Sequence, residues 1–138
     1  MILYLDTSSL VKLYLEEEGC REVRSLVDLA TVVATSALAY PEARSAFARL
    51  RREGGLTEEE HSQVKSELER DWSSFLTLHV SEKIWRHAGE LTEIHALRGF
   101  DSLHLASYLA VATLDLTQRI EFSAHDQRLA AAARAAAA

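Results

Sequence analysis

The stretch from Met1 to Ser9 constrains the fold of this chain more than any other. It begins with Met-Ile-Leu-Tyr-Leu, an unbroken apolar or aromatic run, which is followed by Asp6 and then by three hydroxyl residues. A short continuous apolar run is typical of a strand buried on both faces, as in the parallel sheet of an α/β domain. Asp6 would then lie at the carboxyl end of the strand, where ligands of such sheets bind. Taken alone, Asp6 is more simply interpreted as a helix cap.

The rest of the chain alternates between strands and helices. Strands are expected at about 31–34, 75–79 and 120–122, and helices at about 7–18, 20–29, 36–52, 57–71, 81–96, 100–113 and from 126 onwards. This order predicts an α/β fold with a mainly parallel sheet of four or five strands flanked by helices. We expect residues 1–138 to form a single domain, in which about 36–71 form a helical arm.

Local signals predict several helix ends. Thr57 and Glu60 have the spacing of a capping box, and Ser81 is expected to cap the next helix. Gly99 is expected to end that helix. Pro41 is expected to bend the first turn of the helix at about 36–52.

Composition excludes some classes of protein. The single cysteine, Cys20, allows no intrachain disulfide, which fits a reducing cytoplasm, and no thiol-catalysis motif surrounds it. The longest apolar stretch, 103–114, is interrupted and too short to span a bilayer, so we expect no membrane association. The first residues also lack the basic flank of a signal peptide.

The charge pattern is uneven. The net charge of −6 argues against broad nucleic-acid binding, which usually requires a basic face. Nevertheless, basic residues cluster in one segment, at Arg44, Arg49, Arg51 and Arg52. A basic face on an acidic protein can still contact phosphates, although each arginine alone is most simply a solvated surface residue.

Four acids occupy comparable places. Asp6 ends the first strand, Glu42 lies one turn inside the helix after the second, Asp101 begins an apolar helix, and Asp126 follows the last strand. In a doubly wound sheet these places share one edge, so the four carboxylates are expected to meet in one cleft.

Such a cluster has a chemical consequence. Two carboxylates about 5 Å apart repel by roughly 3 kcal/mol at an effective dielectric constant near 20, so a group of four either takes up protons or holds a cation. Oxygen ligands without cysteine favour Mg²⁺ or Mn²⁺, and such a cleft suits metal-assisted phosphoryl chemistry. Helix capping explains Asp6, Asp101 and Asp126 singly, but it does not explain Glu42, which lies inside its helix.

Four segments carry a resemblance to a known family. They are Leu3–Lys12, Thr35–Arg44, Arg98–Ala106 and Phe122–Leu129. In this order and spacing they resemble PIN-domain proteins of the VapC toxin type, and the resemblance extends over nearly the whole length. It implies a PIN-like three-layer sandwich.

The resemblance also implies a function. Such proteins are Mg²⁺- or Mn²⁺-dependent endoribonucleases, in which Asp6 and Asp101 would bind metal directly, while Glu42 and Asp126 would act through water or bind a second ion. Ser8 would orient Asp6 or a water molecule. The implied partners are an RNA substrate, a cognate antitoxin whose C-terminal segment blocks the cleft, and a second copy in a homodimer.

The sequence departs from the family pattern at one position. The family often carries a threonine two residues before the fourth acid, and this chain has Ala124 there, next to Ser123. The departure concerns the placement of Asp126 rather than its presence.

Several other residues are candidates for a role in substrate binding, metal binding or packing. Arg44 and Lys12 are candidate substrate-binding cations at the rim of the cleft. A hydrogen-bonded core position is preferred to a metal-binding role for His104, and an exposed position without a role is preferred for His125. For both tryptophans, Trp72 and Trp85, packing or a dimer contact is preferred to base stacking.

Two alternative functions remain open. One is a noncatalytic PIN-like module that binds RNA or a protein, although such a module gains nothing from four repelling carboxylates. The other is a metal-dependent phosphatase. The aspartyl-phosphate phosphatases require an acid two residues after the nucleophilic aspartate, where this chain has Ser8.

Overall fold

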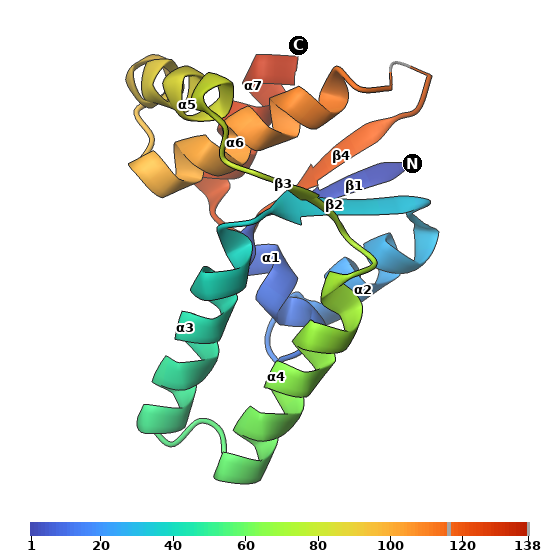
Figure 1. The fold of residues 1–138 in the computed structure, drawn as a ribbon, viewed down its shortest axis with the longest axis vertical. Helices are drawn as coiled ribbons and strands as arrows, with labels where there is room; N and C mark the ends of the chain where they lie inside the picture. Colours follow the sequence, from blue (N-terminus) through green and yellow to red (C-terminus); the bar gives the residue numbers. More distant parts are fainter. Residues whose placement is uncertain (116, 138) are drawn as a thin grey trace.

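The computed structural model describes residues 1–115 and 117–137, which are arranged around one parallel sheet (Figure 1). The strands are β1 (Ile2–Leu5), β2 (Val32–Ser36), β3 (Leu76–Leu78) and β4 (Ile120–Ser123), in the order β3-β2-β1-β4. Every neighbouring pair is parallel. The expected α/β fold with a mainly parallel sheet of four or five strands is therefore confirmed, and the sheet has four strands in the described residues.

Strand β1 is apolar throughout because it is buried on both faces. Ile2 and Tyr4 pack into one hydrophobic cluster, whereas Leu3 and Leu5 pack into another on the opposite face of the sheet. Successive side chains of a strand point to opposite faces. The unbroken apolar run therefore supplies both layers of the core at once.

Helices cover both faces and complete the three layers. The Leu3 face is covered by α1 (Thr7–Leu10), a short 3₁₀ turn η1 (Val11–Leu13), α2 (Cys20–Leu29), α3 (Ala39–Arg52) and α4 (Glu58–Trp72). The Tyr4 face is covered by α5 (Glu82–His95), α6 (Gly99–Ala112) and α7 (Gln127–Ala137). Helices α3 and α4 extend side by side away from the sheet (Figure 1).

Two helix boundaries differ from expectation. The helix predicted over 7–18 ends with η1 at Leu13, and the exposed Glu16–Glu18 lie in the loop that follows. Three consecutive acids are unfavourable at the negative end of a helix dipole, which accounts for the early end. Strand β2 extends to Ser36, so α3 begins at Ala39 rather than at about residue 36, and the Thr35 hydroxyl donates to the backbone oxygen of Leu5 at 2.7 Å.

The two predicted helix breakers act differently from expectation. Pro41 lies in the first turn of α3, where its missing N–H would have had no intrahelical partner, so no helical bond is lost there. Gly99 begins α6, and the left-handed residue that ends α5 is Ala96, with φ of 53°. In residues 1–115 and 117–137, no helix is both long and apolar enough to cross a membrane.

Candidate active site

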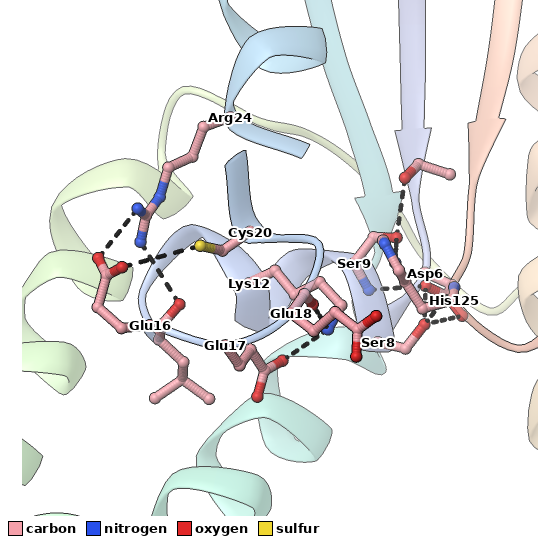
Figure 2. Close-up of polar contacts among 12 residues, drawn as sticks. Asp6, Ser8, Ser9, Lys12, Glu16, Glu17, Glu18, Cys20, Arg24 and His125 are labelled. Carbon is pink, nitrogen blue, oxygen red and sulfur yellow. Dashed lines mark hydrogen bonds and ion pairs between the residues drawn. The ribbon is translucent and has the colours of Figure 1, made fainter. Parts of the chain in front are cut away.

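Asp6 lies at the carboxyl end of β1 and is only 4% exposed. Its Oδ1 accepts from the backbone N–H of Ser9 at 2.9 Å, which caps α1, and the Ser8 hydroxyl lies within 2.9 Å of both carboxylate oxygens (Figure 2). Burial raises the pKa of Asp6. The electrostatic influence of His104 and the hydrogen bonds from Ser9 and Ser8 offset this only in part, and the nearby charge of Asp101 raises the pKa further. The buried carboxylate is therefore one whose negative charge a cation would stabilise.

Ser8 joins Asp6 to the far end of the chain. Its oxygen accepts from the backbone N–H of His125 at 3.0 Å, in the loop between β4 and α7. His125 is exposed, as expected, and its ring Nδ1 lies 3.0 Å from the Ser9 hydroxyl (Figure 2). The loop that precedes Asp126 is thus held against the turn that carries Asp6.

Glu42 projects from the first turn of α3 and is held by two side chains. The Thr7 hydroxyl donates to its Oε1 at 2.6 Å, and His104 Nε2 lies 3.1 Å from the same oxygen. Burial by itself raises the pKa of Glu42, but the hydrogen bonds from His104 and Thr7 outweigh it, and the net shift is downward. Glu42 is therefore held as an oriented carboxylate.

His104 is a buried, hydrogen-bonded residue, as the sequence predicted. Its Nδ1 lies 2.9 Å from the hydroxyl of Tyr4, on the central strand β1. Thr7 donates its only hydroxyl proton to Glu42, so its oxygen can only accept from His104 Nε2 at 3.1 Å. Nε2 consequently carries a proton, and in the neutral ring Nδ1 accepts from Tyr4.

Asp101 and Asp126 share one cation. Arg98 Nε lies 3.2 Å from Asp101 Oδ2, and its Nη2 lies 3.9 Å from Asp126 Oδ2. The Arg98 side chain is 80% exposed, so its hold on either acid is weak. Asp126 also caps α7, because its Oδ1 accepts from the N–H of Leu129 at 2.9 Å.

Three observations connect the four acids. Glu42 and Asp101 line the same cavity of about 690 Å³, Asp101 acts electrostatically on Asp6, and Arg98 links Asp101 to Asp126. Within the described residues, no three His, Cys, Asp or Glu side chains form a ready-made metal-binding group.

The donor set nevertheless fits a hard divalent ion. Mg²⁺ is usually held by one or two carboxylates and keeps several waters, so a buried acid beside a second one is sufficient. The donors here are carboxylate oxygens, which suit Mg²⁺ or Mn²⁺ better than softer metals. The exposed Arg98 guanidinium is a cation that such an ion would replace at Asp101.

The two candidate substrate-binding cations are bonded to groups other than the four acids. Lys12 Nζ is 2.9 Å from Glu17 Oε1 and donates to the backbone oxygen of Glu18 at 2.7 Å (Figure 2). Arg44 donates to the Tyr40 hydroxyl at 2.8 Å, on the arm. In the described part of the chain, no hydrogen bond or ion pair joins either cation to the four acids.

Sequence reasoning missed two residues of the site, Thr7 and Arg98. Thr7 was noted only as one of the three hydroxyl residues after Asp6, although a hydroxyl directly after Asp6 was a usable signal. Arg98 lies three residues before Asp101, a spacing at which side chains meet on a helix. Beside the family departure at Ala124, the buried Ser123 hydroxyl pairs with Ser9 at 2.8 Å, so it is engaged away from Asp126.

The family model for the PIN domain matches residues 3–111. The chain therefore belongs to the PIN-domain family. It is 37% identical over 135 residues to Ribonuclease VapC45 and to Ribonuclease VapC49, from two strains of Mycobacterium tuberculosis, and each match covers 98% of this chain and 91% of the relative. The resemblance to VapC-type PIN proteins that the sequence indicated is confirmed.

Solved structures share the fold. FitAcB from Neisseria gonorrhoeae matches with a TM-score of 0.68 and 18% identity, covering 97% of this chain and 94% of that one. VapC20 of Mycobacterium tuberculosis, described as a sarcin–ricin loop cleaving toxin, matches with a TM-score of 0.63 and 19% identity, covering 94% of both chains. At these identities the likeness extends to the fold alone.

Proposed function

We propose that this protein is a Mg²⁺- or Mn²⁺-dependent endoribonuclease that cleaves RNA phosphodiester bonds as the toxin of a VapBC-type pair. The observation that carries the proposal is the buried carboxylate of Asp6 at the carboxyl end of β1. The nearby negative charge of Asp101 raises the pKa of Asp6 further, so a cation would stabilise both acids. The 37% identity to two ribonucleases over nearly the whole chain supports the same reaction.

Each acid has a role in this proposal. Asp6 and Asp101 hold the divalent ion, while Ser8 keeps the Asp6 carboxylate in place. Such an ion, when bound, activates water and offsets negative charge on the phosphate. Glu42, oriented by its hydrogen bonds, and Asp126 position water around the reacting phosphate or hold a second ion.

The partners follow from the same class. We propose that a small antitoxin blocks the cleft with its C-terminal segment, and toxin–antitoxin complexes among the solved structures of this fold support such a partner. The protein acts as a homodimer in the cytoplasm, with residues 1–138 as one domain. Lys12 and Arg44 contact the RNA from the rim of the cleft.

The direct test replaces one acid at a time. Asp6→Asn and Asp101→Asn are expected to abolish cleavage of RNA under Mn²⁺ while circular dichroism spectra stay unchanged, because asparagine keeps the shape but removes the charge. Asp28→Asn, an exposed acid on α2, is the matched control and should cleave like the parent. Parental rates for either active-site variant would overturn the assignment.

One observation favours a second function, a noncatalytic PIN-like module. Arg98 already supplies positive charge to Asp101 and Asp126, and no three-ligand group exists among the described residues. A divalent-ion titration followed by thermal melting separates the two functions. Stabilisation by Mn²⁺ supports the nuclease, and its absence supports the noncatalytic module.

A further inference from the structure

A cavity of about 690 Å³ opens beside the acids, on the side of the molecule formed by α5 and the start of α6. Glu42 and Asp101 form part of its wall, and the side chains of Trp85 and Phe100 form another part. Cavities of a few hundred cubic ångströms and upward hold small ligands. This one is large enough for a nucleobase, and it is continuous with the candidate active site.

The aromatic side chains of this cavity are unusually accessible. Trp85 is 45% exposed and Phe100 is 61% exposed, and they are the two aromatic residues among the large hydrophobic side chains exposed in the described part of the chain. By contrast, Trp72 is partly buried and packs against Tyr40 and Phe75, as expected for a structural residue. Exposed aromatic surface that gathers at one cavity marks a binding site.

We propose that this cavity binds one unpaired nucleobase of the RNA substrate, next to the phosphate that the acids cleave. The inference rests on the proposed ribonuclease function and defines the substrate more closely. Base–aromatic stacking on Trp85 or Phe100 accepts any base, because every base has a π-face. A base held in a Watson–Crick duplex cannot enter a cavity, so the substrate is single-stranded at this position.

The charges around the cavity fit a nucleotide. Arg98, 80% exposed, lies at its wall, and the Arg86 guanidinium stands 4.7 Å from the centre of the Trp85 ring, so positive charge is available for the flanking phosphates. The carboxylates of Glu42 and Asp101 are acceptors for the N–H groups on base edges. A second copy of this protein seated here would have to desolvate both carboxylates, which is unfavourable without dedicated partners.

The first experiment measures RNA binding in EDTA, so that no metal-dependent step contributes. The probe is a fluorescently labelled single-stranded RNA, and the readout is its dissociation constant by anisotropy. Trp85→Ala and Phe100→Ala should each weaken binding about 5- to 150-fold, the loss expected for one base–aromatic stack. Trp85→Phe should retain most of the affinity. Ile94→Ala, another exposed hydrophobic on α5 at 70% exposure, is the matched control and should bind like the parent.

A second variant fills the cavity without removing any contact. Gly89 lies in α5 on the cavity wall, and a Cβ placed there would meet nothing within 4 Å. Gly89→Gln should therefore preserve or improve helix stability while it obstructs the base and weakens RNA binding. Glu90→Gln introduces the same side chain one residue later, outside the cavity, and should leave binding unchanged.

An abasic scan locates the base. In a series of RNAs with one abasic position each, affinity should fall at a single position for the parent, and that fall should disappear in Trp85→Ala. Equal affinity for all variants, or equal cleavage of a fully duplexed RNA, overturns the subsite. If Trp85→Ala instead lowers the sedimentation coefficient and leaves RNA affinity unchanged, a second copy covers the cavity.

The subsite and the ribonuclease function fail in different ways. If the parent binds single-stranded RNA through Trp85 but never cleaves it under Mn²⁺, the proposed function is wrong and the base subsite stands. If the parent cleaves RNA and Trp85→Ala binds and cleaves it as well as the parent does, the proposed function stands and the base subsite is wrong.

Discussion

Asp6 performs two tasks with one carboxylate. Its Oδ1 caps α1, and the group as a whole faces the other acids from an almost fully buried position. The capping role alone could be met by asparagine or serine at lower electrostatic cost, since neither carries a charge. Burial raises the pKa of this aspartate, so its charged form lowers the stability of the fold. We interpret that loss of stability as the cost of a functional carboxylate.

The first residue-scale prediction follows from that pKa. Because the folded-state pKa of Asp6 is raised above its ordinary value of 3.8, the native protein binds the proton more tightly than the unfolded chain does. Ionisation therefore lowers stability above the folded-state pKa, and the penalty disappears as the pH falls to the unfolded value. In EDTA, Asp6→Asn should raise the melting temperature near pH 7 and lose this advantage towards pH 4. A pH-independent difference would contradict the assignment.

A second residue-scale prediction concerns Thr7. Thr7→Val keeps the shape but removes the proton that Glu42 accepts, so Glu42 should lose its orientation and kcat/KM on RNA should fall about tenfold or more. Thr7→Ser keeps the hydroxyl and should restore most of the rate. If Thr7 acts through Glu42, Thr7→Val should have little further effect in a Glu42→Gln background, and an additive loss would refute that role.

Asp6 could be predicted from the sequence, whereas the long-range contacts of Thr7 and Arg98 could not. Asp6 could be placed at a sheet edge from the apolar run before it, because burial on both faces requires that pattern. The contact of Thr7 with Glu42 and that of Arg98 with Asp126 could not be placed, because they join segments that lie 35 and 28 residues apart in the chain. Such contacts depend on how α1, α3, α6 and α7 pack, which local patterns do not encode.

At the scale of elements, the short loop before α2 is built around Gly19. This residue has φ of 87°, and a Cβ placed there would lie 2.8 Å from His125 Nε2. The loop therefore approaches the β4–α7 connection closely, on the side where Ser8 receives the His125 backbone N–H. The positive φ and this close approach together account for glycine at this position.

Gly19→Ala is therefore expected to destabilise the protein more than a comparable change elsewhere. Gly54 has a similar φ of 82°, but nothing lies within 4 Å of its added Cβ, so Gly54→Ala introduces only the backbone strain of roughly 1–2 kcal/mol. Urea unfolding of the two variants measures the difference. Gly19→Ala should show the larger loss in unfolding free energy, and equal losses would mean that the contact with His125 relaxes freely.

At the scale of the whole molecule, the site lies where the strand order reverses, between β1 and β4. The chain runs from β1 to β2 to β3 on one side and then crosses to β4 on the other side of β1 (Figure 1). Ligands of open α/β sheets bind at such a switch point. Asp6 follows β1 and Asp126 follows β4, so both flank it, while Glu42 comes from the layer of α3 and Asp101 from the layer of α6. The site therefore joins elements from both helical layers.

This arrangement predicts that metal binding stabilises the entire fold rather than one loop. An ion that binds only the folded protein adds about 2.7 kcal/mol at a concentration one hundred times its dissociation constant. Increasing Mn²⁺ should therefore raise the melting temperature of the parent progressively, in a single cooperative transition. Asp6→Asn and Asp101→Asn should shift far less, and Asp28→Asn should follow the parent. If Asp6→Asn gained as much from Mn²⁺ as the parent, the stabilising ion would be bound elsewhere, and the switch point would not be its site.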